Sequence, residues 1–140
     1  MFEITQGHYP DAESTAPLSI GLDVGSTTVK AVITDSHDHV LARHYQRHNA
    51  RQAEIVLSFL QEIERLFPNR RLCTYITGSG GRSIAPLINA LYVQEVNAVT
   101  YAVERLHPDS GSVIELGGQD AKVIIWKEDG QGRKNTLTFM

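Results

Sequence analysis

Residues 22–33 read LDVGSTTVKAVI, and residues 114–125 repeat the pattern as IELGGQDAKVII. Each stretch runs from an apolar residue through an acid, an apolar residue and a glycine to small or polar residues, a lysine and an apolar strand. The repeat aligns Asp23 with Glu115. A strand that ends in an acid, turns on glycine and returns as a strand can hold a phosphate and its metal ion. Two such hairpins, about one small domain apart, predict two half-sites facing each other across a cleft.

The composition predicts a globular protein of one domain or slightly more. The chain has 140 residues, of which 41% are hydrophobic and 21% are charged, and these values are typical of a folded core. A net charge of −3 argues against binding to nucleic acid or membranes by charge alone. No apolar run approaches the roughly 18 residues of a membrane helix, and no signal peptide is evident. Cys73 is the single cysteine, so a disulfide is excluded within the chain and we expect a cytoplasmic protein.

Hydrophobic periodicity predicts a mixed α/β order. Residues 1–17 show no sustained period, so we expect a leader or mobile tail, with an extra edge strand as the alternative. Three strands then follow as an antiparallel meander, because only short turns separate them. The remaining elements, placed by period and by Pro and Gly signals, are a helix over 53–67, a strand over 71–77, a short helix over 81–90, a helix over 93–106 and strands over 112–118, 120–129 and 135–140.

This order, βββ-α-β-α-α and then three strands, predicts an α/β sandwich lobe rather than a continuously parallel sheet. We expect the first lobe over residues 18–111 and the opening strands of an incomplete second lobe over 112–140. A second copy as long as the first would need about another hundred residues. The chain is therefore expected to be one part of a longer protein.

The first hairpin carries the residue types that bind phosphate. Glycine lets the backbone approach an anion closely, and the N–H groups and hydroxyls of Gly25, Ser26, Thr27 and Thr28 can donate to its oxygens. Asp23 would hold a hydrated Mg²⁺. An ordinary hairpin with turn-forming residues is the alternative, and the second hairpin favours the phosphate interpretation.

Three further features leave alternatives open. The GSGG of residues 78–81 invites a dinucleotide fingerprint, but Ser83 replaces its third glycine, so a tight, closely packed turn is favoured over a supporting role near a nucleotide. Glu95 opens a helix, where it either complements the helix dipole or orients water toward a γ-phosphate. Four histidines lie close together and indicate either a solvated hairpin or a metal site, namely His37, His39, His44 and His48.

With both hairpins in place, the sequence resembles the actin-like ATPase superfamily, which includes sugar kinases, actin and heat-shock chaperone ATPases. This resemblance implies ribonuclease-H-like lobes with nucleotide between them. The stretch QEVNAVTYAVERL, residues 94–106, is similar to the segment before the second phosphate motif of the chaperones. A glutamate there positions the attacking water, and the resemblance gives Glu95 that role.

A narrower resemblance rests on DVGSTTVKAV, TGSGGR and especially ELGGQDAK. Over roughly residues 18–140 the chain resembles the activators of 2-hydroxyacyl-CoA dehydratases and benzoyl-CoA reductases. It implies ATP and Mg²⁺, a homodimer with a 4Fe-4S cluster between subunits, and ATP-driven electron transfer into a partner enzyme. The cluster cysteines of that family would follow Met140, Cys73 matches neither of them, and Glu115 replaces a more common aspartate.

The resemblance implies a role for each motif residue. Asp23 and Glu115 would bind Mg²⁺ through water, and Gly25 to Thr28 would cradle phosphates together with Gly117, Gly118 and Gln119. The chain alone is expected to bind nucleotide weakly and not to turn over. The alternatives are a lobe of a small-molecule kinase from the same superfamily and a non-catalytic scaffold lobe.

Overall fold

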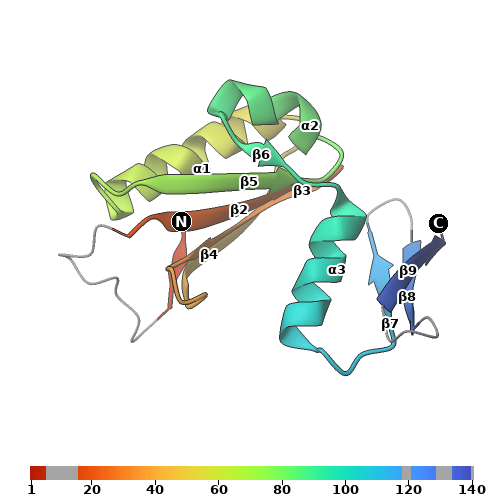
Figure 1. The fold of residues 1–140 in the computed structure, drawn as a ribbon. Coiled ribbons are helices and arrows are strands. Elements are labelled where there is room, and N and C mark those ends of the chain that lie inside the picture. Colours follow the sequence, from red (N-terminus) through yellow and green to blue (C-terminus); the bar gives the residue numbers. More distant parts are fainter. Residues whose placement is uncertain (6–15, 118–120, 129–133, 140) are drawn as a thin grey trace. The chain divides into compact units, whose positions relative to one another are not determined.

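The computed structural model describes residues 1–5, 16–117, 121–128 and 134–139. They belong to two compact units, Met1–Val93 and Gln94–Met140, whose elements are drawn in Figure 1. Unit 1 is built on a six-stranded sheet and unit 2 on a three-stranded sheet. None of the helices in the described ranges has the length and apolar run that crossing a membrane would require.

The sheet of unit 1 has the strand order β1-β4-β3-β2-β5-β6. β2 (Leu18–Val24), β3 (Thr28–Thr34) and β4 (Val40–Arg47) form the antiparallel meander that the short turns predict. β5 (Leu72–Thr77) lies parallel to β2, and β6 (Leu91–Tyr92) lies parallel to β5. β6 is not predicted from the sequence, because a strand of two residues has no hydrophobic period.

Helix α1 (Gln52–Leu66) covers one face of this sheet (Figure 1). Val56, Phe59 and Ile63 recur at helical spacing and are fully buried. Burial of each large apolar side chain stabilises the fold by about 1.5–3 kcal/mol. The alternate residues of β2 from Leu18 to Val24 are also buried. Asp23, which lies between two of them, therefore points to the opposite face of the sheet.

The first residues of the chain belong to the sheet. β1 (Glu3–Ile4) pairs antiparallel with β4, Phe2 is only 5% exposed, and its backbone N–H donates to Glu62 Oε1 at 3.1 Å. The edge strand that the sequence left open as an alternative is thus present at residues 3–4. Burial of Phe2 holds these first residues against the core.

A glycine turn and a broken helix connect β5 to β6. α2 (Gly81–Ile84) passes directly into the 3₁₀ helix η1 (Ala85–Ile88). Pro86 lies in the first turn of η1, where its missing N–H costs no helical hydrogen bond. The α-helix ends at Ile84, before this proline, and η1 is followed by Asn89 in the left-handed conformation with φ 52°.

Unit 2 combines one helix with an antiparallel sheet. α3 (Glu95–Leu106) precedes β7 (Ser112–Leu116), β8 (Ala121–Glu128) and β9 (Lys134–Phe139), which pair in the order β7-β8-β9. The indole Nε1 of Trp126 on β8 donates to Glu104 Oε1 on α3 at 3.1 Å. This contact ties the helix to the second sheet. The first lobe predicted from the sequence, residues 18–111, includes this helix, and the two compact units divide the chain between Val93 and Gln94.

Candidate functional site

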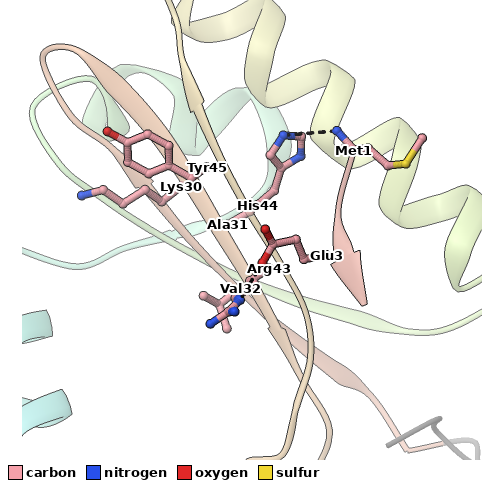
Figure 2. Close-up of a pocket in the computed structure, with 8 residues that line it drawn as sticks. All are labelled: Met1, Glu3, Lys30, Ala31, Val32, Arg43, His44 and Tyr45. Carbon is pink, nitrogen blue, oxygen red and sulfur yellow. Dashed lines mark hydrogen bonds and ion pairs between the residues drawn. The ribbon is translucent and has the colours of Figure 1, made fainter. Parts of the chain in front are cut away.

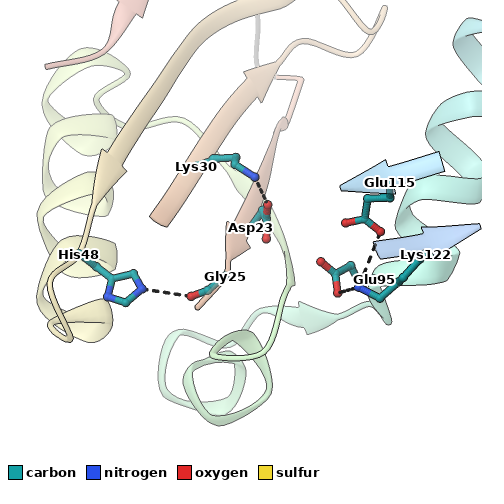
Figure 3. Close-up of polar contacts among 7 residues, drawn as sticks. All are labelled: Asp23, Gly25, Lys30, His48, Glu95, Glu115 and Lys122. Atoms are coloured by element: carbon teal, nitrogen blue, oxygen red, sulfur yellow. Dashed lines mark hydrogen bonds and ion pairs between the residues drawn. The ribbon is translucent and has the colours of Figure 1, made fainter. Parts of the chain in front are cut away.

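The first hairpin places a carboxylate and an ammonium side by side. Asp23, next to last on β2, lies directly opposite Lys30 on β3. The Lys30 Nζ lies 2.7 Å from Asp23 Oδ2 (Figure 3). The Asp23 side chain is 31% exposed, so the pair is open to solvent on one side. The hairpin therefore presents a negative and a positive group at the same strand end.

The other oxygen of Asp23 faces a glycine turn. Asp23 Oδ1 is buried and has no hydrogen-bond partner among the residues that the structure describes. Gly78 has φ +87°, and a Cβ atom built there would lie 2.8 Å from this oxygen and 2.4 Å from the Val24 carbonyl oxygen. The backbone N–H of Gly80 donates to the same carbonyl at 2.9 Å. The GSGG segment is thus the tight, closely packed turn that the sequence favours, and it closes around the end of β2.

The loop after Asp23 is short and partly exposed. The backbone N–H of Gly25 donates to the Thr28 carbonyl at 2.9 Å, and Ser26 and Thr27 lie between them. A Cβ atom at Gly25 would be 3.5 Å from the Thr28 carbonyl oxygen, an ordinary contact. Steric packing does not require glycine at this position. A side chain there would instead block the approach of a ligand to the loop backbone.

His48 holds this loop and was not singled out for that role by the sequence. Its side chain is 4% exposed, and its Nε2 lies 3.2 Å from the Gly25 carbonyl oxygen (Figure 3). The backbone N–H of Ala50 donates to Nδ1 at 3.0 Å. Because Nδ1 accepts this hydrogen bond, the ring proton must lie on Nε2, which donates it to the Gly25 carbonyl. The only sequence signal was the histidine cluster, which gives no indication that this ring is buried.

The second hairpin repeats the same pair in the same register. Glu115 on β7 lies directly opposite Lys122 on β8, and Lys122 Nζ lies 3.7 Å from Glu115 Oε2. The same ammonium lies 2.8 Å from Oε2 of Glu95, the first residue of α3 (Figure 3). The Lys122 side chain is only 9% exposed. One buried ammonium thus holds two of the three predicted acidic site residues next to each other.

The structure describes one of the three predicted phosphate-binding residues of this hairpin. Gly117 is exposed and directly follows β7. Gly118 and Gln119 lie outside the described residues. Glu95 is the acidic residue in the first turn of α3, and its carboxylate is held by the 2.8 Å ion pair with Lys122.

These groups have the chemistry that a hydrated magnesium ion and phosphates require. Mg²⁺ prefers carboxylate oxygens and retains several waters, and the buried Oδ1 of Asp23 is a carboxylate oxygen without a hydrogen-bond donor in the described structure. Lysine ammonium groups and glycine-loop N–H groups bind phosphate oxygens. The residues present therefore fit a metal–phosphate ligand.

The four clustered histidines occupy three different environments. His37 and His39 lie in the turn between β3 and β4. His44 on β4 stacks on Phe59 with ring centroids 4.3 Å apart, and its burial lowers its pKa from the usual 6.5. His48 lies in the loop before α1. They do not form one four-histidine metal site, because the alternation of β4 turns His44 into the core.

A separate hollow lies at the β1–β4 edge of unit 1 (Figure 2). Its volume is about 470 Å³. The polar groups that line it contact one another, since Arg43 Nε lies 3.1 Å from Glu3 Oε2 and the amino terminus lies 3.3 Å from His44 Nε2. Because these polar groups already bind one another, they are not directed at a common ligand, and we assign no function to this hollow.

Known proteins of similar sequence and structure span about twice the length of this chain. No protein-family model matches it. An uncharacterized protein of Methanocaldococcus jannaschii is 29% identical over 112 residues, which are 80% of this chain and 44% of that protein. Component A of the (R)-2-hydroxyglutaryl-CoA dehydratase of Acidaminococcus fermentans has 22% identity and a TM-score of 0.68, over 89% of this chain and 48% of its own.

Two further solved structures are similar. The activator of the 2-hydroxyisocaproyl-CoA dehydratase from Clostridium difficile, with bound ADPNP, is 27% identical with a TM-score of 0.63, over 87% of this chain and 45% of its own. The ethanolamine utilization protein EutJ from Carboxydothermus hydrogenoformans is 19% identical with a TM-score of 0.59, over 88% and 52%. The fold is that of the actin-like ATPases, and the predicted resemblance to the dehydratase activators is confirmed.

Proposed function

We propose that this chain is the ATP-binding part of an activase that couples ATP hydrolysis to low-potential electron transfer into a 2-hydroxyacyl-CoA dehydratase or a related CoA-ester reductase. The strongest support is the repeated cross-strand pair, Asp23 with Lys30 and Glu115 with Lys122, in the same register of two similar hairpins. The likeness to an activator with bound ADPNP supports a nucleotide ligand. Electron transfer, a homodimer, a cytoplasmic location and the identity of the partner rest on the sequence resemblance.

In unit 1, the proposal assigns metal and phosphate binding to one strand end. Asp23 would hold a hydrated Mg²⁺, which supplies positive charge to the phosphate oxygens when bound. Residues Gly25 to Thr28 would donate backbone N–H groups and hydroxyls to the phosphates. Lys30, now 2.7 Å from Asp23 Oδ2, is a second cation beside the same loop. His48 would act as a positioning residue, because it anchors the Gly25 carbonyl.

In unit 2, the proposal assigns water orientation to Glu95. Its carboxylate would accept a hydrogen bond from the attacking water. Lys122 would hold that carboxylate in place through the 2.8 Å ion pair. Glu115 would contact the hydrated Mg²⁺ through water. Phosphate contacts in this hairpin are assigned to Gly117, Gly118 and Gln119.

The residues of this sequence do not fit the iron–sulfur cluster that the resemblance implies. A 4Fe-4S cluster is bound by four cysteine thiolates. The sequence contains one cysteine, Cys73, which is exposed. Two copies of the chain would supply only half of the thiolates. No step of the proposal therefore passes through a cluster.

A calorimetric titration of the chain with Mg-ATP tests the nucleotide claim. We expect saturable binding that Asp23→Ala abolishes and that Glu64→Ala, which removes an exposed carboxylate of α1, leaves unchanged. A folded protein that binds no Mg-ATP would contradict the proposal. Equal binding by Asp23→Ala and the unchanged chain would contradict the role of this carboxylate.

Phosphate release by the longer protein that the sequence leads us to expect, measured alone and with a dehydratase added, distinguishes the alternatives, because this chain by itself is not expected to turn over. Hydrolysis that the dehydratase stimulates supports the activase. A phosphorylated small molecule formed from ATP would indicate the kinase lobe instead. Binding without hydrolysis in either assay would indicate the scaffold lobe.

A further inference from the structure

The turn between β3 and β4 brings one carboxylate and two imidazoles together. Asp35, His37 and His39 can each offer one ligand atom, and these atoms all lie within 4.8 Å of one another. The side chains of Asp35 and His39 are 21% and 52% exposed. An ion from solvent can therefore reach them without any change in the core.

Backbone hydrogen bonds hold this turn in one conformation. Asp35 Oδ1 accepts the backbone N–H groups of His37 at 2.8 Å and His39 at 2.9 Å. The Asp35 N–H donates to the His39 carbonyl at 3.1 Å, and the Asp38 N–H donates to the Asp35 carbonyl at 3.2 Å. Asp38 adopts the left-handed conformation with φ 64°. The three side chains therefore project from a turn whose backbone is already ordered, which reduces the entropy that a ligand must overcome.

The spacing of the groups suits a transition metal. Asp35 Oδ2 and His39 Nδ1 lie 3.0 Å apart, close to the roughly 3.4 Å between two ligand atoms of a tetrahedral zinc ion with bonds of about 2.1 Å. This oxygen and this ring nitrogen can therefore bind one ion with little rearrangement.

The ligand types indicate which class of metal would bind, and the position of the turn separates it from the proposed nucleotide site. Imidazole nitrogens favour zinc, copper and nickel, whereas magnesium prefers oxygen ligands. The turn follows the end of β3 at Thr34, and the glycine loop precedes its beginning at Thr28. At about 3.3 Å per residue, these ends are roughly 20 Å apart.

We propose that the turn formed by residues 35–39 is a binding site for a divalent transition-metal ion. Asp35, His37 and His39 supply three ligands, and water completes a tetrahedral shell. The ion takes the place of the hydrogen bond between Asp35 Oδ2 and His39 Nδ1. This site rests on the turn itself and does not depend on the nucleotide function.

A calorimetric titration of the chain with zinc chloride, without nucleotide or magnesium, tests this site. We expect one zinc ion per chain, and at least a tenfold loss of affinity in His37→Ala and in His39→Ala, because loss of an outer-shell partner alone typically costs 10–100-fold. His107→Ala, which removes an exposed histidine of unit 2, serves as the matched control and should bind zinc as the unchanged chain does.

Thermal unfolding supplies a second readout that also verifies folding of the variants. Zinc should raise the unfolding temperature of the unchanged chain and of His107→Ala, but not of the two turn variants. Absence of zinc binding by the unchanged chain, or unaltered zinc affinity in both turn variants, would overturn the proposal.

Discussion

Replacement of Gly78 by alanine tests how the end of β2 is built. The φ of +87° disfavours any residue with a Cβ atom, at a cost of about 1–2 kcal/mol. The new methyl group would also lie 2.4 Å from the Val24 carbonyl oxygen and 2.6 Å from its carbon. These are backbone atoms, which cannot rotate away, so overpacking adds about 1–3 kcal/mol. We expect Gly78→Ala to lower the free energy of unfolding by about 2–5 kcal/mol.

Urea denaturation followed by circular dichroism measures this change. Gly21→Ala is the matched control on β2, because a Cβ atom there meets nothing within 4 Å, and a shift within about 0.5 kcal/mol is expected. Any Gly78→Ala protein that remains folded should also bind Mg-ATP more weakly, because the methyl group would lie 2.8 Å from Asp23 Oδ1. Equal stability of the two variants would refute the reasoning about the glycine turn.

Four other changes separate folding from function. Gly25→Ala should leave the urea midpoint near that of the unchanged chain, because its Cβ contact of 3.5 Å is ordinary, yet weaken Mg-ATP binding in calorimetry. His48→Phe keeps a ring but leaves the part-buried Gly25 carbonyl and Ala50 N–H without these hydrogen bonds, so urea denaturation should show a loss of about 1–3 kcal/mol, and His48→Gln should lose less. Burial lowers the pKa of His44 below 6.5, so between the folded and unfolded pKa values only the unfolded chain is protonated, and stability should fall as pH drops below about 6.5. His44→Gln should weaken this dependence in denaturation at a series of pH values. Lys122→Met should reduce the rate of phosphate release, measured in the assay with added dehydratase, more than it reduces nucleotide affinity. The reason is that the variant no longer holds the Glu95 carboxylate in place.

Each of these expectations has a result that contradicts it. A destabilised Gly25→Ala would show that the loop needs glycine for folding. Equal loss in both His48 variants would argue against the hydrogen bond to the loop. If His44→Gln leaves the pH dependence of stability unchanged, a group other than His44 takes up the proton on unfolding. If Lys122→Met lowers nucleotide binding and phosphate release equally, Lys122 has a structural role only.

Local pattern was enough to predict most of the elements. Alternation over 18–34 predicted the β2–β3 hairpin, and helical spacing of apolar residues predicted α1, since both periods depend only on neighbouring residues. The single short helix predicted over 81–90 is divided into α2 and η1. Residues 3–4 and β6 were harder to assign, because strands of two residues depend on the partner strand rather than on their own sequence.

The sequence by itself determined that each acid and its lysine lie opposite each other. Positions 23 and 30 flank one short turn, and an antiparallel hairpin pairs residues symmetrically about its turn. Only the tertiary structure decided what surrounds these pairs. Gly78 lies against Asp23, His48 anchors the Gly25 carbonyl, and Lys122 holds Glu95. These contacts join residues more than twenty positions apart, and they form only when the core brings distant segments together, so no local period encodes them.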